Sequence, residues 1–108
     1  MRVLGIDTAT WVASVGITAH GQTLAEHSTV VKSSHATTLL AQIDTVLRTA
    51  QLSPAEIDLI AVAGGPGSFT GLRIGFSVGK SLAYSTQARF VTVSTLAALA
   101  HSTAAHCH

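Results

Sequence analysis

The sequence predicts an α/β domain built on a mixed β-sheet, and three observations lead to this prediction. Three strand-like segments follow one another near the N-terminus with only short turns between them, which is typical of an antiparallel meander. Two later apolar segments are separated from their neighbours by helix-like segments, which is typical of parallel strands. The two patterns together require both strand orientations in one sheet. The expected order is therefore β-β-β-α-(α)-β-α-β-α, with helices on the faces of the sheet.

The three N-terminal strands are predicted from how apolar residues recur. Residues 2–7 are almost continuously apolar, as in a buried strand. Residues 11–18 alternate, so that every second residue, starting with the tryptophan, faces the same side of the sheet. His20-Gly21 then predicts a tight turn into a more polar strand over residues 22–31.

The later elements are predicted from helical spacing and from capping signals. Residues 34–50 carry apolar side chains at helix spacing. The segment "SPAE", which begins at Ser53, is a capping box with proline at the first helical position, so a short second helix is expected there. After the glycine-rich stretch, a further helix is expected to end near Ser85. The last strands and the last helix are expected at residues 58–63, at residues 90–93 and from Ser94 onward.

Composition limits the possible functions. The chain has 108 residues, enough for one domain with a modest core. Apolar residues make up 47% and charged residues only 10%, so part of the surface is covered by a partner or is rich in Ser and Thr; composition leaves both open. The net charge is +1 and no basic run occurs, which argues against a domain that binds nucleic acid by itself.

The cysteine count and the chain ends bear on location and on metal binding. A single cysteine, Cys107, permits no internal disulfide and fits a reducing compartment. The chain opens with a strand-like segment, and no apolar run has the length of a membrane span, so we expect a cytoplasmic protein without a membrane segment. His101, His106 and His108 lie beside that cysteine, but adjacent residues at a chain end rarely form a closed site, and no metal site is predicted.

The stretch from Gly64 to Ser81 resembles the dinucleotide-binding motif G-x-G-x-x-G and the P-loop G-x-x-x-x-G-K-[ST], and it satisfies neither spacing. Gly71, Gly75 and Gly79 are four residues apart, so in a helix they lie nearly on one line. Each glycine inside a helix lowers the stability of that helix by about 0.5–1 kcal/mol relative to alanine. Because glycine has no side chain, a line of glycines also leaves a groove along the helix that another backbone can approach closely. Either this domain's own helix or sheet, or a helix of another subunit, would fill that groove.

Four segments make the chain resemble the bacterial TsaB family, also called YeaZ. They are "MRVLGIDTAT" at the start, "HATTLLAQID" in the first long helix, "GGPGSFTGLRIG" in the glycine stretch and "VSTLAALA" near the end. The resemblance extends from Met1 to about Ala100. It implies one lobe of the fold shared by actin, sugar kinases and the Hsp70 ATPase, which is RNase H-like. Family members carry a second lobe, so residues 1–108 are expected to be the N-terminal lobe alone, from a truncated or cleaved protein.

The resemblance implies a non-catalytic scaffold subunit in the formation of threonylcarbamoyladenosine, the modified base beside the anticodon of tRNA. The catalytic site and its metal are then expected on a TsaD-type partner, and a TsaE-type ATPase joins the assembly. The complex is expected to use ATP and threonylcarbamoyl-adenylate, and to contact tRNA only as a whole. This chain is expected to bind no cofactor and to form a homodimer when alone.

The resemblance also implies where the partner binds, because TsaB-type proteins pair through their first two long helices. Arg73 is the best candidate for a salt bridge to the partner. The expected interface consists of His35, Leu39, Gly71, Leu72, Arg73, Gly75, Phe76 and Gly79.

Two enzymatic alternatives remain open. A weak nucleotide-binding ATPase of the actin-like fold would contact phosphate through Asp7, Thr8 and Thr10, but Cβ atoms occupy the hairpin positions where glycine allows close approach. The alternative for these three residues is a capped polar turn. A glycoprotease-like peptidase is disfavoured because the sequence has no H-E-x-x-H motif and Ser68 lacks the G-x-S-x-G frame. No catalytic residue is therefore predicted.

Overall fold

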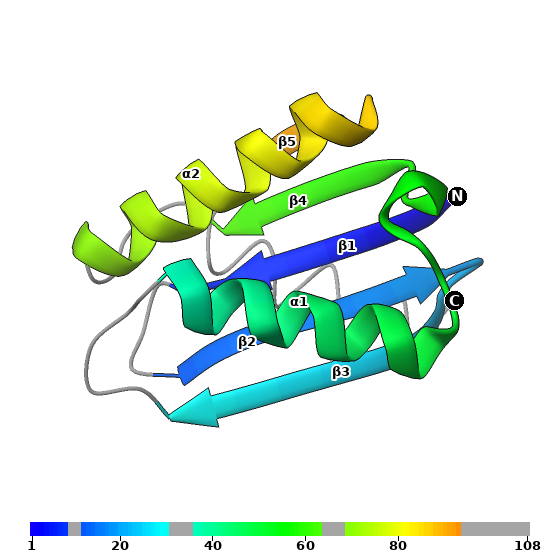
Figure 1. Cartoon of the computed structure of the whole chain (residues 1–108), viewed down its shortest axis with the longest axis horizontal. Helices are drawn as coiled ribbons and strands as arrows, with labels where there is room; N and C mark the ends of the chain where they lie inside the picture. Colours follow the sequence, from blue (N-terminus) through cyan, green and yellow to red (C-terminus); the bar gives the residue numbers. More distant parts are fainter. Residues whose placement is uncertain (9–11, 31–35, 64–68, 94–108) are drawn as a thin grey trace.

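One mixed sheet of five strands forms the centre of the molecule (Figure 1). The computed structural model describes residues 1–8, 12–30, 36–63 and 69–93. The strands are β1 (Arg2–Asp7), β2 (Val12–Ala19), β3 (Gln22–Val30), β4 (Leu59–Ala63) and β5 (Arg89–Val93). Their order in the sheet is β3-β2-β1-β4-β5. The first three pair in antiparallel orientation, whereas β4 runs parallel to both β1 and β5.

The antiparallel half of the sheet forms as the sequence predicts. His20 and Gly21 have positive φ angles of 53° and 76°, the backbone that a two-residue hairpin between twisted strands requires. Along β2 every second side chain is buried, namely Ala13, Val15, Ile17 and Ala19. This alternation confirms that one face of β2 packs against the core and the other does not.

Two long helices, α1 (Ala36–Ala50) and α2 (Phe69–Thr86), cover one and the same face of the sheet. α1 packs on β2 and β3, and α2 packs on β4, β1 and β5. Figure 1 shows the helices splaying apart toward their C-terminal ends. The largest buried side chains between helices and sheet are Leu4, Ile17, Leu39, Val46, Ile60 and Val62.

Both helices end in a residue with left-handed backbone. Gln51 follows α1 with a φ of 59°, and Gln87 follows α2 with a φ of 62°. At the end of α1 the N–H of Leu52 donates to the carbonyl of Leu47 (2.9 Å), and the N–H of Gln51 donates to the carbonyl of Arg48 (3.1 Å). These two bonds make a Schellman motif, which satisfies carbonyls that the helix leaves unpaired.

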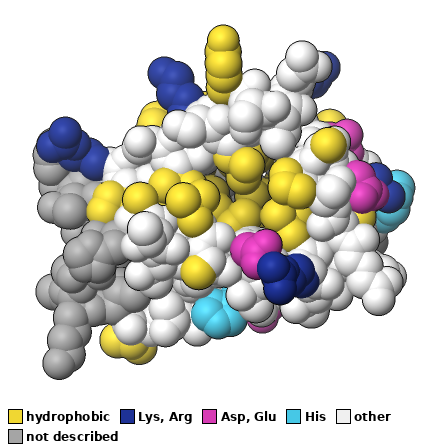
Figure 2. Space-filling model, viewed as in Figure 1, with side chains coloured by type: hydrophobic (Ala, Val, Ile, Leu, Met, Phe, Trp, Pro, Cys, Tyr) yellow, Lys and Arg dark blue, Asp and Glu magenta, His cyan; other side chains and the backbone are white. Residues whose placement is uncertain are grey.

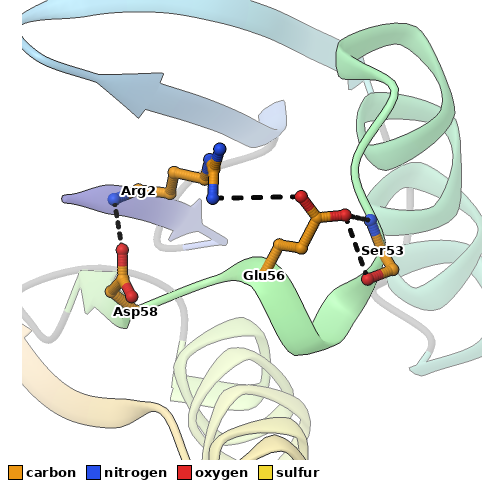
Figure 3. Close-up of polar contacts among 4 residues, drawn as sticks. All are labelled: Arg2, Ser53, Glu56 and Asp58. Carbon is orange, nitrogen blue, oxygen red and sulfur yellow. Dashed lines mark hydrogen bonds and ion pairs between the residues drawn. The ribbon is translucent and has the colours of Figure 1, made fainter.

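The predicted second helix is a single 3₁₀ turn, η1 (Pro54–Glu56). The carboxylate of Glu56 accepts hydrogen bonds from the backbone N–H of Ser53 (3.0 Å) and from its hydroxyl (3.2 Å), as in the predicted capping box (Figure 3). The guanidinium of Arg2 lies 3.9 Å from the same carboxylate, and the backbone N–H of Arg2 donates to Asp58 at 2.7 Å. These contacts tie the start of β1 to the turn before β4.

This cluster holds the Glu56 carboxyl group in its charged form. The hydrogen bond from the Ser53 backbone is the main cause that lowers the pKa of Glu56, and the Ser53 hydroxyl and Arg2 act in the same direction. Desolvation acts in the opposite direction and raises the pKa, by more than either the Ser53 hydroxyl or Arg2 lowers it, but the net pKa of Glu56 is lowered. The cluster lies at the amino end of β1, so we interpret it as part of the scaffold.

The order of elements from β1 to β5 confirms the predicted order. The start of the first long helix at residues 34–35 and the final helix from Ser94 onward lie outside the described residues.

Candidate functional site

The carboxyl ends of β1 and β4 are one place where a ligand site is expected. In α/β sheets, ligands bind outside the carboxyl ends of parallel strands. Of the residues described here, β1 ends at Asp7 and continues to Thr8, β4 ends at Ala63, and α2 begins at Phe69. Thr10 and residues 64–68 lie outside the described residues.

Thr8 does not offer its hydroxyl to a phosphate at this edge. Its side chain is buried, with 2% exposed, and its Oγ1 occupies the place where a Cβ on Gly75 of α2 would lie. The alternation of β1 explains this direction, because Leu4 and Ile6, which are also buried, precede Thr8 on the same side of the strand. The predicted phosphate contact is therefore wrong for Thr8, while Asp7 is half-buried at the strand end.

The glycine stripe faces this chain's own sheet. Gly75 lies against Thr8, Ile6 and Val62, which belong to the β1 and β4 side of the core. A Cβ on Gly79 would lie 2.5 Å from Val62 Cγ2 and 3.2 Å from Phe90 Cε1. The predicted interface role of Gly75 and Gly79 is therefore wrong, because strands of the same chain already fill the groove that these glycines create.

Leu39 is also an interior residue. It is 2% exposed and belongs to the core between α1 and the sheet, so no partner can reach it in this fold. Its helical spacing with Ile43 and Val46, both buried, was the signal for this position. His35 lies outside the described residues, as do the surroundings of Gly71.

The other predicted interface residues lie on the surface of α2. Leu72 is half-buried and Arg73 is exposed. Phe76 is 39% exposed and its ring meets that of Phe90 edge to face, with 5.7 Å between centroids. Since Phe90 belongs to β5, Phe76 marks the flank of α2 that faces the β5 edge of the sheet.

Gln42 and Leu40 mark opposite flanks of α1. The side-chain amide of Gln42 donates to the carbonyl of Ala13 (3.0 Å) and bonds to Nδ1 of His27 on β3 (3.1 Å), so this flank faces β3. Leu40 lies about 200° around the helix from Gln42 and therefore faces α2. It is 49% exposed, and one exposed leucine becomes informative only where further apolar side chains lie beside it.

The facing flank of α2 is apolar as well. Ile74 and Val78 lie about 160–200° around the helix from Phe76, on the side turned toward α1, and Leu82 continues their line. Ile74 and Leu82 are partly buried and Val78 is buried. Figure 2 shows hydrophobic side chains gathered in a hollow between the two helices. We call this surface the interhelix trough, and define it by Leu40, Leu47, Ile74, Val78 and Leu82.

Sequence reasoning missed the trough because it followed the glycines. Leu40 is visible in the sequence as an apolar residue off the main buried face of the first helix, but nothing local shows that no other element covers it. Within the described part of the chain no three His, Cys, Asp or Glu side chains gather to hold a metal ion. Among the same residues, no helix is both long and apolar enough to cross a bilayer.

Comparisons with known proteins agree on one family. A model of the TsaD family, described as tRNA N6-adenosine threonylcarbamoyltransferase, matches residues 23–108. The tRNA threonylcarbamoyladenosine biosynthesis protein TsaB of Bacillus subtilis is 33% identical over 100 residues, covering 93% of this chain and 44% of that protein. The protein of the same name from Escherichia coli is 37% identical over 100 residues, covering 93% of this chain and 43% of its own length.

Solved structures give the same result. YeaZ from Pseudomonas aeruginosa superposes with a TM-score of 0.80 at 34% identity, covering 86% of this chain and 43% of that one. RuvC of Thermus thermophilus (TM-score 0.58, 14% identity, 87% of this chain and 64% of that one) shares the fold. So does a candidate N-acetylmannosamine kinase of Listeria monocytogenes (TM-score 0.57, 16% identity, 87% and 35%).

The predicted fold class is thereby confirmed: the sheet and its helices form one lobe of the actin-like, RNase H-like fold. The chain spans less than half the length of the curated TsaB relatives just described. The family-model match, the identities and the superposition with YeaZ together show that this chain belongs to the TsaB (YeaZ) family.

Proposed function

We propose that this chain acts in the formation of tRNA threonylcarbamoyladenosine, as a non-catalytic subunit that pairs with a TsaD-type catalytic subunit. Its relatives are named for this biosynthesis. In this proposal the catalytic residues, the metal and the threonylcarbamoyl-adenylate belong to the partner, a TsaE-type ATPase joins the pair, and the assembly works in the cytoplasm.

The observation that carries the proposal is the interhelix trough. Leu40 is half exposed, and Ile74 and Leu82 remain partly exposed beside it, so the two helices present a continuous apolar strip. Burying such a strip against a partner contributes about 25 cal/mol per Å² of apolar surface. Helices of a second protein fit between two splayed helices by the same packing that joins helices within a domain.

The buried Thr8 favours the scaffold over the ATPase alternative. A phosphate site at the end of β1 needs donors that point outward, and the hydroxyl of Thr8 is turned beneath α2 instead. Asp7 is the one carboxylate described at this edge.

Size-exclusion chromatography with a TsaD-type protein tests the pairing. We expect co-elution of the two chains, and we expect Leu40→Glu to weaken it at least tenfold, because the substitution places a charge in an apolar contact. Thr38→Glu is the matched control, since Thr38 is exposed on the same helix but about 200° around it from Leu40. Equal pairing of both variants, or no co-elution of the unchanged chain, would contradict the proposal. Sedimentation of the chain alone reports whether it forms the expected homodimer.

A further inference from the structure

The charged side chains of the described residues are unevenly distributed. Arg2 and Arg48 lie beside carboxylates, at 3.9 Å from Glu56 and 2.9 Å from Asp44. Arg89 begins β5 and is exposed, and Arg73 and Lys80 lie on α2, whose 18 residues include no Asp or Glu. Figure 2 shows dark-blue side chains along the margin of the molecule that α2 forms, and dark-blue and magenta ones next to each other over α1 and at the right-hand end.

The cations of α2 share one flank with an exposed aromatic ring. At 100° per residue, Arg73, Lys80 and Tyr84 fall within about 40° of one another around the helix, and Ser77 lies beside them. Tyr84 is 89% exposed, the most exposed of the large hydrophobic side chains in the described structure. We call this surface the α2 outer flank and define it by Arg73, Ser77, Lys80 and Tyr84.

The outer flank is distinct from the interhelix trough. Arg73 and Lys80 lie about 140–160° around the helix from Gly75, which packs on the sheet, so they are on the exposed side of α2. Ile74 and Leu82 lie on the other side, toward α1. A protein seated in the trough therefore leaves room for a second contact along the outer flank.

The chemistry of the outer flank fits a nucleic-acid strand. Lys and Arg bind phosphates, Ser hydroxyls donate to phosphate oxygens, and an exposed aromatic ring is a surface on which bases stack. Seven residues of helix separate the two cations by about 10 Å along the helix axis, a span that separate phosphates of one strand can bridge.

We propose that the α2 outer flank contacts the RNA of the tRNA substrate, with Arg73 and Lys80 on phosphates and Tyr84 stacked on an unpaired base. The inference rests on the proposed function, since it takes tRNA as the RNA. Two cations in a chain of net charge +1 do not hold a tRNA alone, so the flank adds to the binding that the complex provides.

Binding of an unmodified tRNA transcript to the complex with the TsaD-type subunit tests this, measured by fluorescence anisotropy between 0.05 and 0.3 M salt. Each phosphate contact changes the slope of log K against log salt by about 0.7–0.9, so we expect Arg73→Gln/Lys80→Gln to reduce the slope by about 1.5. The corresponding loss of affinity at 0.15 M salt is about 20-fold. Tyr84→Ala is expected to weaken binding at least fivefold without a change of slope.

The matched control is Arg2→Gln/Arg48→Gln, which removes the same net charge from other parts of the surface. Its slope is expected to stay within about 0.5 of the unchanged complex. Equal losses in both double variants would show a general charge effect and overturn the proposal. So would a double variant of the flank that no longer pairs with the TsaD-type subunit, because the flank would then be a protein contact.

Failure of the proposed function is distinguishable from failure of this inference. Pairing with the TsaD-type subunit is measured by co-elution without RNA. RNA contact by the α2 outer flank is measured by the salt dependence of tRNA binding. If the unchanged chain does not pair, the proposed function fails and this inference fails with it. If the chain pairs but the flank variants leave both the salt slope and the affinity unchanged, only this inference fails.

Discussion

Gly79→Ala distinguishes internal packing of the glycine stripe from a role at a subunit interface. The new Cβ would lie 2.5 Å from Val62 Cγ2, whereas carbon atoms in contact prefer about 3.5–4.0 Å. Val62 is fully buried and its branched side chain has little rotamer freedom, so it cannot turn away. Phe90 Cε1 at 3.2 Å and Ile60 Cγ2 at 3.5 Å prevent a sideways escape. Helix α2 must therefore move outward by about 1 Å.

Two opposing effects set the magnitude. Overpacking of this kind costs about 1–3 kcal/mol. Alanine in place of glycine inside a helix contributes about 0.8–1.0 kcal/mol in the other direction. The expected net loss is about 1 kcal/mol of unfolding free energy, which corresponds to a drop in Tm of about 4–8 °C for a domain of this size. Gly79→Leu, which adds three more carbon atoms at the same place, is expected to lose more.

Urea and thermal unfolding of the chain alone, followed by circular dichroism, measure this loss. Ser81→Ala is the control, since Ser81 is exposed on the same helix and its change should stay within about 0.5 kcal/mol. If Gly79 instead lined a groove for another subunit, alanine would raise the stability of the isolated chain by about 1 kcal/mol. A stabilised Gly79→Ala variant would therefore refute the internal packing that we describe.

Two further predictions concern the ends of elements. The pKa of Glu56 is lower in the folded chain than in the unfolded one, so its contribution to stability is full above the unfolded pKa of about 4.3 and is lost as pH falls through the folded pKa. In urea unfolding, Glu56→Gln should thus have a lower free energy of unfolding than the unchanged chain at pH 7 and nearly the same one at pH 3. A difference that stays constant across pH would contradict the hydrogen bonds from Ser53 to the Glu56 carboxylate. Gln51→Gly should raise the unfolding free energy by up to about 1 kcal/mol, because glycine adopts the φ of 59° at the end of α1 without strain, whereas Gln51→Ala should give no such gain.

The two nucleotide-loop resemblances in the glycine stretch have a simple explanation. Lys80 and Ser81, which complete the apparent P-loop, lie in the middle of α2. Backbone N–H groups in the middle of a helix are bonded to carbonyls of the preceding turn and cannot cradle a phosphate. The spacing of four between glycines reflects one helix face lying close to a sheet.

The interhelix trough was less predictable than the fold, because the exposure of a side chain on a helix depends on which other elements pack beside that helix. Leu39 and Leu40 are adjacent leucines in one helix, yet the first is buried in the core and the second is half exposed. Periodicity could have separated them, since Leu39 shares a face with Ile43 and Val46. Nothing local, however, shows that the second helix splays away and leaves Leu40 uncovered.

By itself the sequence determined the order of the elements, the buried face of β2, the hairpin at His20-Gly21 and the family. These features depend on alternation, helical spacing and turn residues, which act between positions close along the chain. The tertiary structure alone decided that Gly75 meets Thr8, that Gly79 meets Val62 and that the trough stays open. Any closely approaching backbone can pack against a helix face lined with glycines. Which element packs there therefore depends on how strands and helices that are distant in the sequence come together in the folded chain.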